Sequence, residues 1–349
     1  MKLLYITNGI TGSGGLERVL SIKASYFTDK MEYEIHIITL NEANQVPFYN
    51  FSPKIKIHNI ETKKGFFYFS SYIKFINQIV KEIHPHIISV CDDGLKGLYV
   101  PLWIKKGTSK IIYERHASMR LNGNIISRFL MRMGGYLYDK VIVLTNYNLS
   151  EWNSKNVMVI PNPISFTPSQ TSTLDNHQII CVGSLSHNKG YDLLIDAWSK
   201  IAHLYPTWNI HIYGKGNADI YKSHINRLGL QKQITFHEPV QDIEAIYQQS
   251  SMLVLSSRSE GFGMVLIEAM NNGVPCIAFD CPCGPRDIIQ DGQNGFLVKP
   301  LDTDELSQKI TRLIEDKELR INMGMIAKQT AQQYFIEKIA IQWKNLFEY

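Results

Sequence analysis

The sequence predicts an α/β fold made of two doubly wound, Rossmann-like domains, and three observations support this. Short apolar runs typical of strands alternate with helical segments along most of the 349 residues, as in parallel sheets covered by helices. A polar segment rich in Ser, Thr and Pro, residues 164–178, interrupts the alternation. The same pattern then restarts. We therefore expect domains at residues 1–163 and 179–332, joined by a linker at 164–178.

Each domain is expected to contribute its own strands. In the first domain they lie at residues 2–8, 34–40, 56–60, 87–91, 110–114 and 140–144, and in the second at 179–183, 208–214, 233–237, 252–256, 276–279 and 295–298. Helical character begins at Leu16 and at Tyr191, in each case after the loop that follows the first strand of a domain.

The end of the chain predicts one more helix, over residues 333–349. Its apolar side chains recur at helical spacing. They are Tyr334, Phe335, Ile339, Ile341, Trp343, Leu346 and Phe347.

Composition indicates a globular protein of the cytoplasm. Hydrophobic residues make up 44% and charged residues 19% of the chain, which are ordinary values for a soluble domain. No run approaches the roughly 20 apolar residues that span a bilayer, and the start of the chain has no signal-peptide pattern. Five cysteines, an odd number, fit a reducing compartment.

Positive charge is concentrated in the first domain. Residues 1–170 hold 20 Lys and Arg against 12 Asp and Glu, whereas residues 171–349 hold 16 against 20, so +8 and −4 sum to the net +4. Cations also stand beside apolar residues at 63–69 and 125–138. This pattern favours peripheral contact with an anionic inner membrane rather than nucleic acid, and the alternative is that both segments are ordinary helices packed on the first sheet.

The stretch from Ser256 to Met270, reading SSRSEGFGMVLIEAM, is the most informative part of the chain. It follows a strand run and is expected to turn into a helix near Met264. Gly261 and Gly263 allow the backbone to approach a ligand closely. The amides of the first helical turn would offer donors to a phosphate.

Two carboxylates bracket this loop. Glu260 lies in the loop and Glu268 about one turn inside the helix, so one can meet a sugar and the other a ribose, because carboxylates accept bidentate hydrogen bonds from vicinal hydroxyls. For the glycines alone, an ordinary strand-to-helix turn with an acidic first-turn residue is the simpler interpretation.

The order of motifs extends beyond this loop. The Glu-x7-Glu pattern is followed by GVP at 273–275, GPRDII at 284–289 and NGFLV at 294–298. This order resembles the retaining GT-B glycosyltransferases of family 4, the glycosyl transferases group 1, over nearly the whole chain. The resemblance implies a cleft between the domains, a terminal helix that returns to the first domain, and transfer of a sugar from a nucleotide-sugar to a lipid-linked or surface-polysaccharide glycan. A UDP-sugar is the expected donor, with GDP-mannose as the alternative.

The resemblance also assigns donor residues. The diphosphate would meet Gly15, Lys189, Gly263 and Met264, the donor sugar Glu260, Gly261 and Phe262, the ribose Glu268, and the nucleobase Pro239, Val240 and Tyr213. Where the family often has arginine, this chain has Ser184. Lys189 is therefore expected to be the main cation on the leaving group. Tyr213 could equally belong to the core.

On the acceptor side the resemblance points to Gly14, Arg115 and His116. His116 follows a strand and matches the family's active-site histidine, with hydrogen bonding near the transferred sugar or the acceptor hydroxyl as its role, and it is paired with Glu260 as a catalytic residue. The resemblance implies retention by a same-face mechanism in which the leaving diphosphate helps to deprotonate the acceptor. No metal and no other cofactor is expected.

Three other functions remain open on the sequence. The glycine-rich run at 9–15 suggests a nicotinamide-dependent dehydrogenase as one hypothesis. Against it, the Gly-x-Gly-x-x-Gly motif and the acidic residue about 20 positions later are absent. A UDP-N-acetylglucosamine epimerase would share the two-domain build, and the spacing of the two glutamates argues against it. A non-catalytic sugar- or nucleotide-binding protein is the third.

Overall fold

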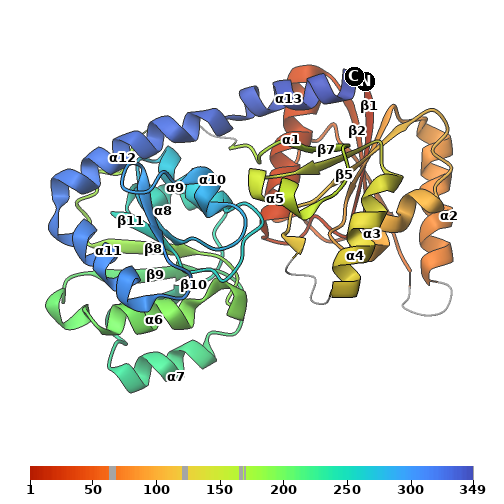
Figure 1. Ribbon diagram of the computed structural model, residues 1–349. Helices are drawn as coiled ribbons and strands as arrows, with labels where there is room; N and C mark the ends of the chain where they lie inside the picture. Colours follow the sequence, from red (N-terminus) through yellow and green to blue (C-terminus); the bar gives the residue numbers. More distant parts are fainter. Residues whose placement is uncertain (63–67, 120–124, 165–167, 169, 349) are drawn as a thin grey trace. The chain divides into compact units, whose positions relative to one another are not determined.

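The computed structural model describes residues 1–62, 68–119, 125–164, 168 and 170–348. It separates into two compact units, residues 1–163 with 336–349 and residues 164–335 (Figure 1). Each unit contains a parallel sheet with helices around it. The predicted α/β fold class is confirmed.

The sheet of the first unit has the strand order β3-β2-β1-β4-β5-β6-β7. The unit consists of β1 (Lys2–Thr7), α1 (Gly15–Met31), β2 (Glu34–Leu40), β3 (Lys56–Ile60), α2 (Tyr68–Ile83), β4 (Ile87–Cys91), α3 (Leu95–Tyr99), β5 (Lys110–Glu114), α4 (Ile125–Gly134), β6 (Lys140–Val143), α5 (Asn146–Glu151), β7 (Val157–Val159) and α13 (Ile336–Glu348). Strand β7 was not among the predicted strands.

Alternate residues of the central strand β1 divide the core of this unit. Leu4 and Ile6 pack with residues of α2 and α4 on one face, such as Ile76 and Met131. Leu3 and Tyr5 pack with α1 and α13 on the other face. Strands buried on both faces read as continuous apolar runs, which is why they could be recognised in the sequence.

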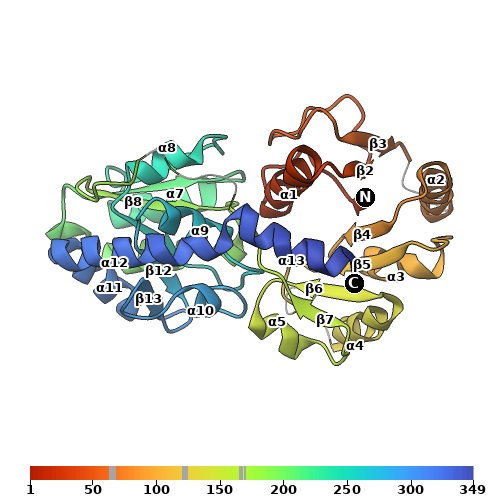
Figure 2. The ribbon, with the colours of Figure 1, turned by 90° about the horizontal axis from the view of Figure 1, so that it is seen from above.

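The terminal helix crosses α1 near one end in the ribbon views (Figures 1 and 2), and the rings of Phe27 and Phe347 meet there at 5.7 Å. The helix begins at Ile336, because Phe335 is extended and ends a short 3-10 turn at Gln332–Tyr334. Ile341 lies outside the buried face of this helix, since it is 56% exposed.

The sheet of the second unit has the order β10-β9-β8-β11-β12-β13. Its elements are β8 (Gln178–Val182), α6 (Tyr191–Ser199), β9 (Asn209–Tyr213), α7 (Asp219–Leu228), β10 (Ile234–His237), α8 (Ile243–Gln248), β11 (Met252–Leu255), α9 (Met264–Asn271), β12 (Cys276–Phe279), α10 (Pro285–Ile288), β13 (Gly295–Val298), α11 (Thr303–Glu315) and α12 (Lys317–Ala331). Helices α6, α7 and α11 cover one face, and α8, α9 and α12 lie on the other side in Figure 1.

The described part of segment 164–178 packs on the second unit. The Ser172 hydroxyl donates to the Ser250 carbonyl, and the Leu174 carbonyl accepts from the Ser251 hydroxyl. Leu174 is buried. This polar stretch is therefore held to its own unit by hydrogen bonds from serine hydroxyls to backbone carbonyls.

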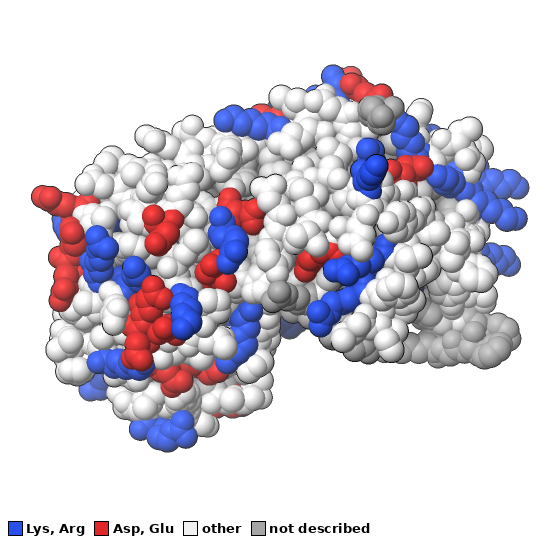
Figure 3. Space-filling model, viewed as in Figure 1, with Lys and Arg blue, Asp and Glu red and all other residues white. Residues whose placement is uncertain are grey.

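Surface charge can be followed on one face of the molecule. In Figure 3, acidic and basic side chains lie side by side on the second unit, so the acidic excess of this half does not form a separate acidic surface on the face shown. Within the described part of the chain, no helix is long and apolar enough to cross a membrane. Of the segment 63–69, in which cations stand beside apolar residues, residues 63–67 lie outside the described part of the chain.

Candidate active site

The strand order of each sheet indicates where a ligand would bind. Neighbouring strands β1 and β4 in the first sheet, and β8 and β11 in the second, lead into connections that run in opposite directions. Ligands of doubly wound sheets bind beyond the carboxyl ends of the strands at such a switch point. In the second unit, the loops that follow β8 and β11 contain Lys189 and Glu260.

These two loops are held together by their backbones. Gly190 has φ +65°, and a Cβ there would lie 2.0 Å from the Ser256 carbonyl oxygen, so only glycine fits. The Ser256 hydroxyl donates to the Lys189 carbonyl at 3.0 Å, and the Arg258 amide donates to the Asn188 carbonyl at 2.7 Å. Backbone geometry therefore determines where Lys189 lies.

The side chains of the two loops also pair. Lys189 Nζ lies 2.7 Å from Glu260 Oε1, and the two side chains are 19% and 10% exposed. The cation expected on the diphosphate and the carboxylate expected on the sugar thus meet at the switch point of the second sheet. This is the central feature of the candidate site.

Arg258 is a residue of this region to which the sequence assigned no role. Its guanidinium makes a bidentate pair with Asp192 at 2.9 and 2.6 Å and also donates to the His187 carbonyl. The hydrogen bonds from Arg258 lower the pKa of Asp192. Arg258 therefore clamps the Glu260 loop onto the start of α6. An arginine two positions before Glu260 was the available signal.

The glycine-spaced part of the loop leads into α9, as expected. Gly263 has φ +94° and precedes Met264, the first residue of α9. Gly284 approaches the backbone of Phe262 so closely that a Cβ would lie 2.0 Å from its carbonyl oxygen. The Phe262 ring, 3% exposed, meets Tyr334 edge-on at 5.6 Å and belongs to the interior. Only the backbone of Phe262, together with Gly261, is then suited to line a donor site.

Glu268 lies inside α9 and is 2% exposed. The Tyr247 hydroxyl donates to Glu268 Oε2 at 3.0 Å. The carboxylate is thus oriented by a residue of α8, which the sequence could not show.

The residues expected near the nucleobase follow β9 and β10. Pro239 and Val240 are half-buried, and Tyr213 is 8% exposed. The Tyr213 ring stacks on His237 at 4.4 Å. Tyr213 therefore presents a ring that is already covered on one face.

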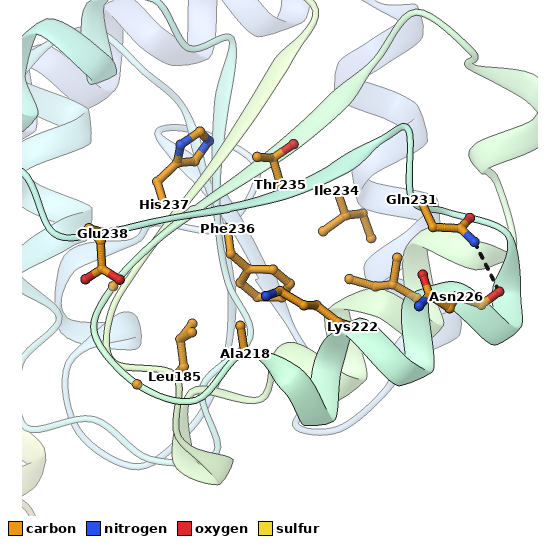
Figure 4. Close-up of a pocket in the computed structure, with 13 residues that line it drawn as sticks. Leu185, Ala218, Lys222, Asn226, Gln231, Ile234, Thr235, Phe236, His237 and Glu238 are labelled. Carbon is orange, nitrogen blue, oxygen red and sulfur yellow. Dashed lines mark hydrogen bonds between the residues drawn. The ribbon is translucent and has the colours of Figure 1, made fainter.

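A cavity of about 450 Å³ lies beside these residues, between α7 and the edge strand β10 (Figure 4). Phe236 and Ile234 form apolar walls, and Lys222 and Glu238 add charge. The lining includes Glu238 but neither Pro239 nor Tyr213. The cavity thus begins where the expected base-reading segment begins and extends away from it along β10.

In the first unit, α1 begins at Gly15 with Gly14 as its N-cap. His116 follows β5, and its backbone amide donates to Asp93 Oδ1 at 2.9 Å. The His116 side chain is 8% exposed, and its Nε2 lies 3.5 Å from Glu114 Oε2. Among the described residues neither ring nitrogen has a hydrogen-bond partner. A buried imidazole in that condition is suited to receive a ligand.

Arg115 occupies a different environment from the one expected for an acceptor-facing residue. It is 1% exposed. Its guanidinium donates to the carbonyl groups of Asp93, Ala117 and Ser118. Arg115 therefore holds the loop that presents His116.

Potential metal ligands also meet in the first unit. The ligand atoms of Cys91, Glu114 and His116 lie within 4.8 Å of one another. Lys23 already forms an ion pair with Glu114, and burial raises the pKa of the Cys91 thiol well above its ordinary value. A protonated thiol and a carboxylate that is already paired with a lysine are poor metal ligands.

Similarity to known proteins extends over the whole chain. Residues 166–330 match the family model described as Glycosyl transferases group 1. An uncharacterized glycosyltransferase of Haemophilus influenzae is 30% identical over 99% of this chain and 99% of its own. The amylovoran biosynthesis glycosyltransferase AmsD of Erwinia amylovora is 28% identical with the same coverage.

Solved structures share the fold. A mutant of S. aureus TarM in complex with fondaparinux, alpha-GlcNAc-glycerol and UDP superimposes with a TM-score of 0.86 at 16% identity, covering 100% of both chains. Anabaena HepE in complex with UDP and glucose gives 0.82 at 20% identity, covering 100% of this chain and 99% of that one.

Proposed function

Because this chain belongs to the glycosyl transferases group 1 family and has the GT-B fold, we propose that this glycosyltransferase moves a hexose or N-acetylhexosamine from a UDP-sugar to a glycan hydroxyl. The Lys189–Glu260 pair at the switch point of the second sheet carries the proposal. It supplies a cation for a diphosphate and a carboxylate for a sugar in one place.

The donor would bind along the second unit. Lys189 would meet the diphosphate, as would the amides of Gly263 and Met264 at the start of α9. The sugar hydroxyls would meet Glu260 and the backbone of Gly261 and Phe262. Further along, the ribose would meet Glu268, and the base would meet Pro239, Val240 and Tyr213. Lys189 and the backbone amides are held in place before the ligand binds. The protein therefore needs little reorganisation to stabilise the charge that develops on the leaving group.

His116 and Gly14 would face the acceptor in the first unit. A hydrogen bond from a neighbouring hydroxyl of the acceptor to the imidazole would orient the attacking oxygen, whose own proton stays available to the leaving group. We propose that configuration is retained, with the leaving diphosphate taking the proton of the hydroxyl, and that Lys189 and the amides stabilise the leaving group without a metal.

UDP is favoured over GDP as the nucleotide because UDP is the nucleotide named in the TarM and HepE complexes. A polysaccharide intermediate is favoured as acceptor because AmsD acts in amylovoran biosynthesis.

A panel of UDP- and GDP-sugars tests the donor, because a ligand that binds the folded state raises the melting temperature. We expect a UDP-sugar to give the largest rise and to be consumed when a glycan acceptor is present. E260Q and H116A should lower transfer, with E318Q as a control because Glu318 is exposed on α12. A larger rise with GDP-mannose would assign the alternative donor. Undiminished transfer in both variants would overturn the site assignment.

We further propose that the enzyme works at the inner face of the plasma membrane on a lipid-linked acceptor. Helix α4 supports this, because Met131 is buried while one side of the helix stays open. Ile125, Ile126, Phe129 and Met133 are 80%, 68%, 61% and 50% exposed. An exposed apolar helix face with Arg128 and Arg132 on the same helix suits a lipid surface.

Flotation with anionic vesicles at low salt tests the attachment, since salt screens such attraction. We expect the protein to float with the vesicles, and F129S combined with I126S to reduce the bound fraction. I220S is the matched control, because Ile220 is 74% exposed on α7 of the second unit. Absence of binding by the unmodified protein would refute the membrane proposal and leave the transferase proposal intact.

A further inference from the structure

A charged cluster is buried directly behind His116. Glu114, the last residue of β5, is 2% exposed, and Lys23 of α1 is 1% exposed. The Lys23 ammonium forms an ion pair with Glu114 Oε2, and the Ser89 hydroxyl of β4 donates to Glu114 Oε1. The carboxylate is thus held from both sides by groups on two different elements.

Aromatic rings cover the cation of this cluster. Lys23 Nζ lies 4.0 Å from the centre of the Trp343 ring and 5.1 Å from that of Tyr5. Trp343 belongs to α13, the helix that crosses α1 (Figures 1 and 2). The terminal helix therefore excludes water from the ion pair, and the pair keeps its geometry.

Stability alone is a weak reason for such a pair. Taking two charges out of water is unfavourable, and apolar residues of similar volume often replace a buried ion pair without loss. Burial by itself would raise the pKa of Glu114, but Lys23 and His116 outweigh it and lower the pKa to about 2. Glu114 is therefore a carboxylate at neutral pH. It can only accept hydrogen bonds.

This carboxylate faces one nitrogen of His116. Nε2 lies 3.5 Å from Glu114 Oε2, while the backbone of His116 is held by Asp93. An acceptor opposite Nε2 favours the tautomer that carries its proton there. Nδ1 then keeps a lone pair, and the side chain is more than nine-tenths buried with no hydrogen-bond partner for Nδ1 among the described residues.

We infer that Glu114, held by Lys23 and Ser89, is a positioning residue that keeps His116 in the Nε2–H tautomer, so that Nδ1 accepts a hydrogen bond from a hydroxyl of the bound sugar or acceptor. The inference rests on the proposed function, which supplies that hydroxyl. Glu17 of α1 also interacts with His116 electrostatically, and Glu17 is left intact in the variants below.

A double-mutant comparison separates positioning from stability. E114Q places an amide between Lys23 and His116, so we expect kcat to fall roughly 10- to 100-fold while the KM for the donor stays close to that of the unmodified enzyme. It also leaves the Lys23 charge buried without its partner. K23M combined with E114Q removes both charges and should recover melting temperature without recovering kcat. Recovery of both would mean that Glu114 is only structural, and the inference would fail.

The inference also predicts how the two residues combine. In H116A, the further change E114Q should leave kcat unchanged, because Glu114 acts through His116. Multiplicative losses in the double variant would overturn the proposal.

The tautomer can be read without any substrate. Nitrogen-15 NMR of the full chain, with H116A used for assignment, should show His116 as the Nε2–H form near neutral pH, and K23M with E114Q should change that signature. A Nδ1–H form in the unmodified protein would overturn the inference. If no donor or acceptor supports transfer, the proposed function fails, whereas the NMR result still decides the tautomer.

Discussion

Lys189 Nζ lies 2.7 Å from Glu260 Oε1, although 71 positions separate the two residues along the chain. The contact joins the loops at the carboxyl ends of β8 and β11, the point where the second sheet reverses its strand order. The carboxylate pairs with the ammonium and holds it in place. A bound nucleotide-sugar would then exchange one anionic partner of Lys189 for another, and Glu260 would turn to the sugar.

Removal of the Lys189 charge should weaken nucleotide binding. A charge-assisted hydrogen bond contributes about 1.5–3 kcal/mol, so K189M should raise the Kd for UDP roughly 10- to 100-fold. Titration calorimetry with UDP measures this directly. K232M is the matched control, because Lys232 is exposed in the same unit. Equal affinities in the two variants would remove Lys189 from the diphosphate site.

Replacement of Gly190 should be destabilising because of a steric clash, and comparison with Gly229 separates this clash from backbone strain. Gly190 and Gly229 have similar φ values, +65° and +72°, but a Cβ at Gly190 meets the Ser256 carbonyl, whereas one at Gly229 meets nothing within 4 Å. We expect G229A to cost about 1 kcal/mol of unfolding free energy through backbone strain alone. G190A should cost more and should also raise the donor KM, because it forces the two loops apart. Thermal unfolding and steady-state kinetics of both variants test this.

Arg258 should matter more for donor binding than for stability. Its pair with Asp192 is partly exposed, at 22% and 36% for the two side chains, so R258K should change the unfolding free energy by about 1 kcal/mol or less. Lysine cannot reproduce the bidentate geometry, so the Glu260 loop should lose its orientation and the donor KM should rise several-fold. R227K, an exposed position on α7, should leave KM unchanged. A stability loss in R258K without any change in KM would contradict this prediction.

The stability of the first unit should fall as the pH falls. The rings of His36 and His58 stack, and His36 Nδ1 lies 2.8 Å from His58 Nε2. Burial lowers the pKa of both imidazoles below the ordinary value of 6.5. The unfolded chain then binds protons at a higher pH than the folded chain, so this stability is present above 6.5 and is lost as the pH drops through the lowered folded values. H58N should therefore show a smaller drop in melting temperature than the unmodified protein between about pH 7.5 and about pH 5.5. An identical drop in both proteins would show that the pair makes no contribution.

Most of the fold could be predicted because strands buried on both faces leave continuous apolar runs between polar loops. The predicted bounds of β2, β3, β4 and β5 agree with the structure. Strand β7 was missed, since it has only three half-buried residues and exists through its pairing with β6 at the edge of the sheet.

The candidate site was predictable as a set of loops. The motif around Glu260 and the loop before α6 could be recognised because residue type and spacing along one segment are local properties. The sequence by itself thus determined the fold class, most strands and the segments that carry polar groups to the carboxyl ends of the sheets.

Which side chains meet there was decided only by tertiary structure. Lys189 pairs with Glu260 because β8 and β11, distant in sequence, end at the same edge of a sheet. Lys23 pairs with Glu114 across 91 positions because α1 packs on the sheet that contains β5. Arg115 and Phe262 turn into the interior because packing against neighbouring elements sets the direction of a side chain. Periodicity assigns a residue to an element, but the neighbours of that element decide whether the residue faces a ligand.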